Sequence, residues 1–234
     1  MTDNIHCTDC DVKSLTCFRS LDSESIKYLD EHKSTFFYKK GQTIFYEGGI
    51  PPGIYCLKSG KIKIYKLGID GKEQIVRFAT SGGLLGISAL VGGRQYSAYA
   101  ETIEDSVICL VNKTTFIKLI DENSEFSHCL MKILSRLLED AENKMTSLAQ
   151  KPVRERLAET LIIMNNLFHS YPASPNGSTI SLSRNDLANI VGTATETVIR
   201  LLSEFKDEEL IAINGRSITL LDIDDLKKTG KVFD

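Results

Sequence analysis

The sequence predicts an α+β protein with a β-rich N-terminal half, one long helix and a C-terminal domain in which two helices precede a β-hairpin. Three observations support this fold class. Short apolar segments separated by glycines extend from about residue 35 to residue 112. Apolar residues then recur every three or four positions between Phe126 and Leu148. Near the C-terminus, a further helical pattern ends before an Asn214-Gly215 turn signal.

The N-terminal half carries the two-residue period of half-buried β-strands. The strands are expected to include residues 43–46, 53–57, 61–65, 74–78 and 107–110. Glycines separate these segments, and pairs of glycines at 48–49, 82–83 and 92–93 mark sharp corners. Many short strands joined by glycine-rich corners predict a barrel or a sandwich.

The apolar spacing after this region predicts a single helix of about 25 residues. Its stripe is long enough to pair with a copy of itself, which predicts a homodimer; an internal core helix is the alternative. The residues expected in the dimer seam are Leu130, Leu134, Leu137, Leu138, Ala141, Met145 and Leu148. Pro152 separates this helix from the next, which should extend to about Phe168. A loop is expected over residues 171–178.

The bulk composition is that of an ordinary globular protein. Hydrophobic residues make up 42% and charged residues 25%, with a net charge of −3. No apolar run is long enough for a membrane span and the N-terminus lacks the pattern of a signal peptide, so the expected location is the cytoplasm. In that compartment clustered cysteines bind metal or react more often than they form structural disulfides.

The segment from Ser183 onward has the pattern of a helix-turn-helix. Ser183 and Asp186 form a capping arrangement at the start of one helix, and Gly192-Thr193 provides a tight turn. A second helix from Thr195 collects apolar residues on one face, namely Val198, Leu201, Leu202 and Phe205. The strands around Asn214-Gly215 then form a wing.

The outer face of this second helix is expected to read DNA bases in the major groove. Arg200 can donate two hydrogen bonds to guanine, Glu196 can accept from cytosine, and Ile199 can contact a thymine methyl. The expected backbone contacts are Thr195, Thr197, Ser183 and Arg216. The alternative is a purely structural role, in which Thr193 and Glu196 form a capping box and Arg200 is a solvated side chain. Because acidic residues slightly outnumber basic ones beyond Lys151, positive charge must be concentrated on the DNA-facing side.

Three cysteines near the N-terminus, Cys7, Cys10 and Cys17, have the spacing of metal ligands. A four-thiolate site requires one more, and the sequence offers Cys56, Cys109 and Cys129 without choosing among them. His6 is interpreted as a bystander. The alternative is that all are reduced structural thiols, although an 11-residue arm has little core for three cysteines to fill.

Taken together, the chain resembles the Crp/Fnr family of transcription regulators over nearly its whole length. The resemblance rests on the double-glycine turns, the segment from Leu57 to Lys63 and the segment from Thr195 to Leu202. It implies a β-roll of the cyclic-nucleotide-binding type (jelly-roll-like), a dimerisation helix and a winged helix-turn-helix that binds a palindromic operator, with RNA polymerase as a further partner. The implied domains are a cysteine-rich arm at 1–22, a sensory β-roll at 23–120, a dimerisation helix at 121–150 and a DNA-binding domain at 151–234.

Within the family the chain is most similar to the Fnr branch, in which three arm cysteines and one at the end of the roll hold a [4Fe–4S] cluster. The resemblance therefore implies the ligand set Cys7, Cys10, Cys17 and Cys109, and a regulator that responds to oxygen or nitric oxide. Cyclic-nucleotide-binding relatives carry a Glu and an Arg where this chain has Ile87 and Tyr96, so a cyclic nucleotide is not expected. Ile199 stands where Fnr-like proteins have Ser, which predicts a different outer base in the half-site.

Three alternatives remain for the sensor. Four thiolates also hold a [2Fe–2S] cluster, and the same fold could use zinc or no metal, with Cys10 and Cys17 as a disulfide switch. An iron–sulfur electron carrier is a rival from another class that predicts no operator binding. The sequence contains no pattern of a catalytic triad or phosphate-binding loop, so an enzyme is not expected.

Overall fold

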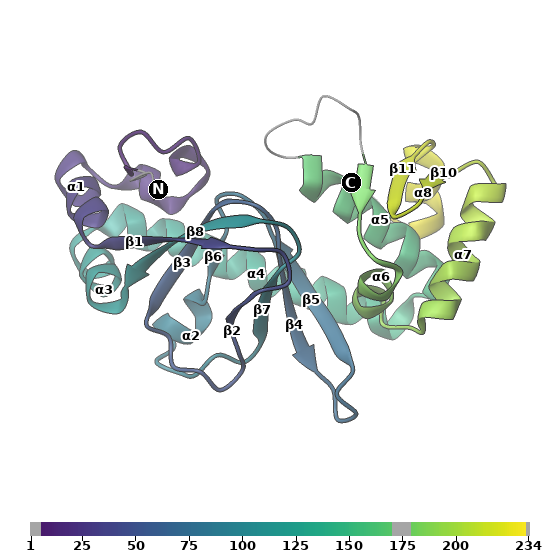
Figure 1. Ribbon diagram of the computed structural model, residues 1–234, viewed down its shortest axis with the longest axis horizontal. Helices are drawn as coiled ribbons and strands as arrows, with labels where there is room; N and C mark the ends of the chain where they lie inside the picture. Colours follow the sequence, from purple (N-terminus) through teal and green to yellow (C-terminus); the bar gives the residue numbers. More distant parts are fainter. Residues whose placement is uncertain (1–5, 170–178, 233–234) are drawn as a thin grey trace. The chain divides into compact units, whose positions relative to one another are not determined.

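The structure is a computed structural model that describes residues 6–169 and 179–232 (Figure 1). The expected loop at 171–178 lies outside the described residues. The chain forms two compact units, one from residues up to 67 together with 76–140, the other from 68–75 together with 141 onward. Each unit has its own core and is described by itself.

The first unit is built on two four-stranded sheets that form a β-roll (Figure 1). One sheet has the order β1-β8-β3-β6 and the other β2-β7-β4-β5. Their bounds are β1 Lys33–Tyr38, β2 Thr43–Phe45, β3 Gly53–Ser59, β4 Ile62–Leu67, β5 Glu73–Ala79, β6 Leu84–Leu85, β7 Tyr99–Thr102 and β8 Ser106–Asn112. Alternate side chains from both sheets, among them Leu57, Ile62 and Ile108, are fully buried in a shared core. The roll confirms the sandwich of short strands that the sequence predicts.

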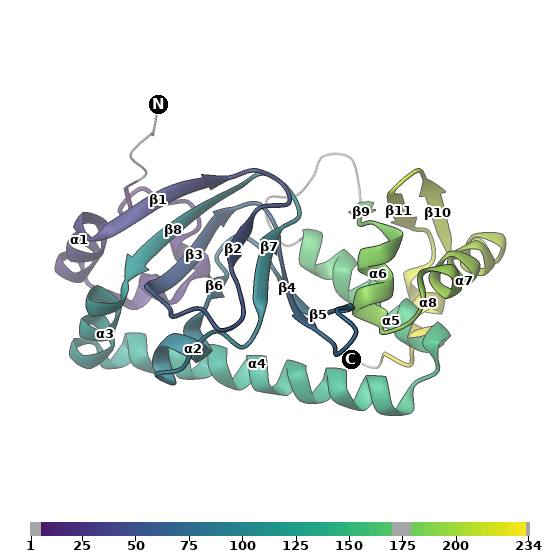
Figure 2. The ribbon, with the colours of Figure 1, turned by 60° about the horizontal axis from the view of Figure 1, so that its bottom comes forward.

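Helices cover one end of the roll. The arm contains two short 3-10 helices, η1 Lys13–Leu15 and η2 Cys17–Ser20, and leads into α1 Ser23–Glu31. Asp22 caps α1 by accepting a hydrogen bond from the Ser25 N–H at 2.8 Å. Asn112 caps α3 (Lys113–Glu122) by accepting from Thr115 N–H at 2.8 Å, and α2 spans Ile87–Val91. Buried residues of η2, α1, α2 and α3 share one apolar core with Phe126. Figure 2 shows α1 and α3 at the same end of the roll.

Helix α4 spans Ser124–Gln150 without interruption, as the apolar spacing predicts. Its apolar residues divide into two sets. Leu130 is buried at 3% exposure, and Leu134 and Leu137 are partly buried against the first unit's core. By contrast Met131, Leu138 and Met145 are between 53% and 66% exposed. No helix within the described residues is long and apolar enough to cross a membrane.

The second unit is a winged helix-turn-helix. Its elements are α5 Val153–His169, β9 Thr179–Ser181, α6 Arg184–Val191, α7 Thr195–Asp207, β10 Ile211–Asn214, β11 Ser217–Leu220 and α8 Ile223–Gly230. The strands form a sheet of order β10-β11-β9. Asn214 pairs with Ser217, so Gly215 and Arg216 form the tip of the hairpin. Gly215 has φ 57°, a backbone conformation that favours glycine.

Side-chain hydrogen bonds join α4, α5 and α8 where the chain turns at Pro152. Lys151 Nζ donates to Glu159 Oε1 at 2.8 Å and to the Gly230 carbonyl at 2.8 Å. Ser147 donates its hydroxyl to the same Glu159 carboxylate. One lysine therefore links the end of α4 to one residue in α5 and to the last residue of α8.

Candidate thiol cavity and nucleic-acid interface

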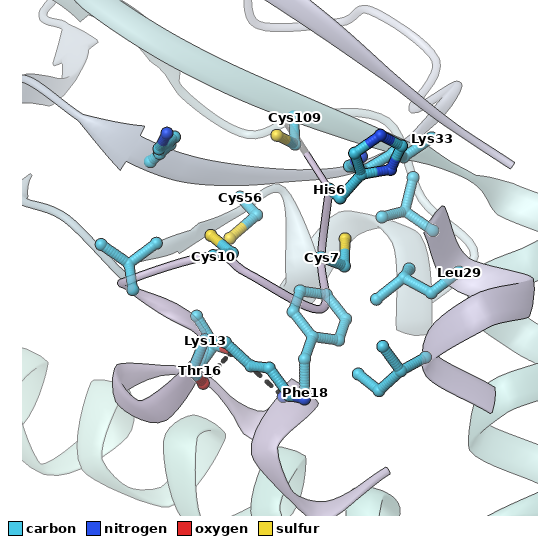
Figure 3. Close-up of a pocket in the computed structure, with 14 residues that line it drawn as sticks. His6, Cys7, Cys10, Lys13, Thr16, Phe18, Leu29, Lys33, Cys56 and Cys109 are labelled. Carbon is cyan, nitrogen blue, oxygen red and sulfur yellow. Dashed lines mark hydrogen bonds between the residues drawn. The ribbon is translucent and has the colours of Figure 1, made fainter. Parts of the chain in front are cut away.

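A cavity in the first unit is lined by four cysteines from two parts of the chain (Figure 3). Cys7 and Cys10 come from the arm, Cys56 from the middle of β3 and Cys109 from β8. All four are free thiols. The remaining walls are largely apolar, with Val12, Phe18, Ile26, Leu29 and Val111 among the lining residues. The arrangement brings together three of the four expected metal ligands and adds Cys56.

The carboxylate of Asp30, in α1, anchors the arm beside this cavity. It accepts the Cys7 backbone N–H at 2.7 Å and the Lys33 ammonium at 2.6 Å, and it lies 2.7 Å from the ring Nδ1 of His6. Burial by itself raises the pKa of the Asp30 carboxyl, but the hydrogen bonds from Lys33, His6 and Cys7 outweigh it and hold that pKa well below its usual range. His6 thus contacts the carboxylate that anchors the arm.

Burial raises the pKa of the thiols of Cys7, Cys56 and Cys109. The pKa of Cys7 rises to about 12 through burial, although nearby Lys33 lowers it. Burial also raises the pKa of Cys56 and Cys109, while a hydrogen-bonding contact between Thr35 Oγ1 and Cys109 Sγ at 3.6 Å opposes the rise at Cys109. These three thiols are therefore protonated at neutral pH unless a positively charged ligand displaces the protons.

Cys17 departs from the expected ligand set. It is 1% exposed, does not line the cavity, and forms a disulfide with Cys129 in α4. The Cys10–Cys17 disulfide considered from the sequence is therefore not formed; the cysteine bonded to Cys17 lies 112 residues away. Spacing along the chain suggested a ligand, but the local 3-10 turn directs this side chain into the core instead.

The donors that line the cavity are thiols, which ligate both zinc and iron–sulfur clusters. Among residues 6–169 and 179–232, no three His, Cys, Asp or Glu side chains converge closely enough to hold one metal ion. A tetrahedral zinc site requires four donors at about 2.1–2.3 Å from one atom. An iron–sulfur cluster instead distributes its thiolates over separate iron atoms, which suits sulfurs spread around a cavity wall. Lys33 and Lys58 also line the cavity and would offset the negative charge of such a group.

In the second unit, α6 and α7 adopt the expected helix-turn-helix geometry. Gly192 ends α6 with φ 73°, and its N–H bonds the Ala188 carbonyl at 2.9 Å. The expected apolar face of α7 is buried, with Val198, Leu201, Leu202 and Phe205 at 4% exposure or less. Glu196, Ile199 and Arg200 lie on the outer face, and Ile199 is 49% exposed. This large apolar side chain is available for an external contact.

Two of the residues expected to contact bases, Glu196 and Arg200, differ in their interactions within the protein. Ala194 caps α7 without a side-chain hydrogen bond, so the capping box between Thr193 and Glu196 is not formed. Arg200 is paired with Glu204 on the next turn of α7, and Glu204 also accepts from Arg154 at 3.1 Å.

The remaining expected contacts lie around the start of the motif and in the wing. Thr195 and Thr197 are partly exposed in the first turn of α7. Ser183 caps α6 and donates its hydroxyl to Asp186 at 2.6 Å, so this hydroxyl already has a structural role. Arg216 is exposed at the wing tip.

Aromatic side chains fill the interior of the β-roll. Tyr96 is buried at 4% exposure and stacks on Phe45 with ring centroids 3.9 Å apart. Ile87 is buried at 1%, so the two positions that carry charges in nucleotide-binding relatives belong to the packed core here.

Comparison with known proteins agrees with both halves of the fold. Residues 35–123 match the family described as the cyclic nucleotide-binding domain, and residues 155–229 match the Crp-like helix-turn-helix domain. The fumarate and nitrate reduction regulatory protein of Vibrio cholerae is 30% identical over 93% of this chain and 87% of its own length. The transcriptional activator protein Anr of Pseudomonas protegens is 31% identical over 93% of this chain and 89% of its own.

Among solved structures, FixK2 from Bradyrhizobium japonicum superimposes with a TM-score of 0.76 at 26% identity. The match covers 86% of this chain and 99% of FixK2. The Vibrio cholerae and Pseudomonas protegens relatives are named as a regulatory protein and a transcriptional activator rather than as enzymes, and the similarity of all three proteins extends through the roll, the long helix and the DNA-binding unit. The chain is accordingly a DNA-binding transcription regulator that belongs to the Crp/Fnr family.

Proposed function

We propose that this regulator senses oxygen, nitric oxide or cellular redox state through an iron–sulfur cluster, most simply [4Fe–4S], held in the thiol cavity. The observation that carries the proposal is the meeting of Cys7 and Cys10 from the arm with Cys109 from the roll around one space. When bound, such a cluster supplies a centre that reacts with oxygen or nitric oxide. The relatives named for fumarate and nitrate reduction support a role in anaerobic gene regulation.

The arm and roll provide a physical route from the sensor to the rest of the chain. Without a cluster, the arm is held to the first unit through Asp30 and through the Cys17–Cys129 disulfide. Thiolate bonds from Cys7 and Cys10 would add an attachment that lasts only as long as the cluster. Loss of the cluster therefore loosens the arm next to Phe126 and Leu130, residues of α4 that belong to the same core.

The visible spectrum of anaerobically purified protein tests this proposal. We expect a brown protein with iron, acid-labile sulfide and a thiolate-to-iron absorption band that changes when air is admitted. A protein that stays colourless after anaerobic reconstitution with iron and sulfide contradicts it. The same sample, tested for operator binding before and after air, shows whether the spectral change alters DNA affinity.

On the DNA side, we infer that Glu196, Ile199 and Arg200 contact base edges, while Thr195, Thr197, Ser183 and Arg216 contact the sugar–phosphate backbone. Their position on the outer side of α7, at the start of the motif and at the wing tip supports these roles. Arg200 must exchange Glu204 for guanine, and an exposed ion pair of this kind costs only about 1 kcal/mol or less to break. Binding is expected in the cytoplasm, with RNA polymerase as a further partner.

We further propose that the protein binds its operator as a homodimer through the exposed side of α4. Six residues alternate at spacings of three and four, which is the seam pattern of a two-stranded coiled coil. They are Met131, Leu134, Leu138, Ala141, Met145 and Leu148. Relative to the seam expected from the sequence, this pattern adds Met131 and leaves out Leu130 and Leu137, which fall off its three-and-four spacing. Leu130 is buried in the first unit's core, and both Leu134 and Leu137 are partly buried against that core.

A second candidate is a redox switch without a metal, and the disulfide between Cys17 and Cys129 favours it. In this mechanism oxidation ties the arm to α4, and reduction releases it. Zinc and disulfides are colourless, so the spectrum distinguishes both from a cluster. A colourless protein whose operator affinity changes with a dithiol reductant would support this candidate instead.

A further inference from the structure

We propose that Cys56 takes the place in the cluster ligand set that the sequence assigned to Cys17, so that the four ligands are Cys7, Cys10, Cys56 and Cys109. This inference rests on the proposed function, because it concerns how the same cavity holds its cluster. It departs from the ligand set implied by the family resemblance, in which all three of the first ligands come from the arm.

The register of the β-roll places Cys56 beside an expected ligand. Cys56 in β3 is directly opposite Cys109 in β8 in an antiparallel pair. Side chains at opposed positions emerge on the same face of a sheet, with Cβ atoms about 4.5–5.5 Å apart. Both cysteines line the cavity, so the face that they share is the one that the arm covers. Two ligands are thus fixed by adjacent rigid strands.

The arm brings its two thiols to the same place. Figure 3 shows Cys7, Cys10, Cys56 and Cys109 around the same space. All four thiols therefore line one cavity.

Cys17 faces away from this space. Its neighbours Thr16 and Phe18 line the cavity, but Cys17 does not. Its sulfur is bonded to Cys129, and its side chain is 1% exposed within the core that also contains Phe126. To become a ligand, Cys17 would have to lose the disulfide and then turn out of this core, which requires η2 to rearrange.

A variant that lacks both disulfide cysteines provides the decisive test. The full-length C17A/C129A protein retains only the four cysteines that line the cavity, so a fully thiolate-ligated cluster in this variant must use Cys56. We expect it to take up wild-type amounts of iron and sulfide on anaerobic reconstitution. Its Mössbauer spectrum should match that of the wild type, because no iron atom has lost a sulfur ligand.

C56A and C129A complete the comparison. We expect C56A to lose the absorption band and most of its iron, while C129A, which keeps Cys17 as a free thiol, behaves as the wild type. Far-UV circular dichroism and thermal unfolding of C56A and C56S establish that the loss is not a failure to fold. If C56A cannot be folded, the result for C17A/C129A alone decides.

Two results overturn the inference. One is a C56A protein with wild-type iron, sulfide and Mössbauer spectrum. The other is a folded C17A/C129A protein that loses its cluster while C129A keeps it, since that identifies Cys17 as the ligand. A wild-type protein that takes up no cluster refutes the proposed function itself, and so the two failures are distinguishable.

Discussion

Cys17 in the arm and Cys129 in α4 are joined by a disulfide, although 112 residues separate them in the chain. The bond lies in the same buried cluster as Phe18 and Phe126, whose rings stack with centroids 5.6 Å apart. The arm is therefore attached to the long helix by a covalent bond as well as by packing.

Reduction of this disulfide should destabilise the protein. Closing a loop of this length lowers the entropy of the unfolded chain, and such a cross-link contributes about 2–5 kcal/mol to the free energy of unfolding. Urea unfolding with and without a dithiol reductant, in cluster-free protein, measures the difference. The C17A/C129A variant is the control and should show no effect of reductant. An equal effect in both proteins would mean that the reductant acts elsewhere.

Replacing Asp30 should release the arm. Asp30→Asn weakens the acceptor for the Cys7 amide, so hydrogen exchange at that amide should become faster in the cluster-free protein. Mass spectrometry of a peptide that includes Cys7 measures this exchange. Glu31→Gln changes a neighbouring exposed carboxyl and should leave it unchanged.

The same anchor has a predictable pH dependence. A carboxyl with a lowered pKa adds stability above its ordinary pKa of about 4, and that stability disappears only as the pH falls through the lower value of the folded state. Because the pKa of Asp30 is held well below its usual range, the wild-type arm should still be protected at about pH 4. If the Cys7 amide of the wild type lost its protection from hydrogen exchange between about pH 6 and pH 5, the lowered pKa of Asp30 would be contradicted.

Arg200→Ala should weaken binding to the specific operator by about 1–3 kcal/mol and relax the preference for guanine at one position. Titration of operator and scrambled duplexes at fixed salt measures both effects. Lys206→Ala, in the last turn of α7, is the matched control and should have a smaller effect on base preference. Equal losses on both duplexes would make Arg200 a phosphate contact only.

Ile199→Ser should alter base preference without altering stability. The side chain is 49% exposed, so its replacement should change the free energy of unfolding by no more than about 0.5 kcal/mol. Loss of the apolar contact should reduce the preference for thymine at the outer position of the half-site. Binding to a set of operators that vary at this position measures the change, and an unchanged order of preference would exclude a base contact by Ile199.

Ala141→Asp should weaken the dimer, because it introduces a negative charge in each helix at the proposed seam. Asn143→Asp adds the same charge two residues away, at a position that points outward in the same heptad, and should leave association unchanged. Sedimentation velocity over a range of concentrations compares the two variants. Equal dissociation constants would exclude Ala141 from the seam.

The fold could largely be predicted because its signals are periodic. The two-residue alternation predicts strands such as β3 and β8, and the three-and-four spacing predicts all of α4. The buried face of α7 follows from the spacing of Val198, Leu201, Leu202 and Phe205, which the structure confirms. Local periodicity determines these faces, and tertiary packing does not override it.

The thiol cavity could be predicted only in part, because its geometry depends on side-chain direction. The spacing of Cys7, Cys10 and Cys17 does not reveal that a 3-10 helix turns Cys17 inward. Likewise, Leu130 and Met131 are adjacent apolar residues, and only packing reveals that Leu130 is internal and Met131 exposed. The strand pattern contained Cys56, but its register against Cys109 depends on a pairing that sequence periodicity does not specify.

The hydrogen bonds of Lys151 have a mechanical consequence. Its ammonium donates hydrogen bonds to Glu159 in α5 and to the last carbonyl of α8. These two hydrogen bonds should stiffen the turn at Pro152. The residue that follows α4 is thereby tied to both α5 and α8 within the second unit. In Lys151→Ala the Glu159 carboxylate and the Gly230 carbonyl lose this shared donor, so the turn should bend more easily.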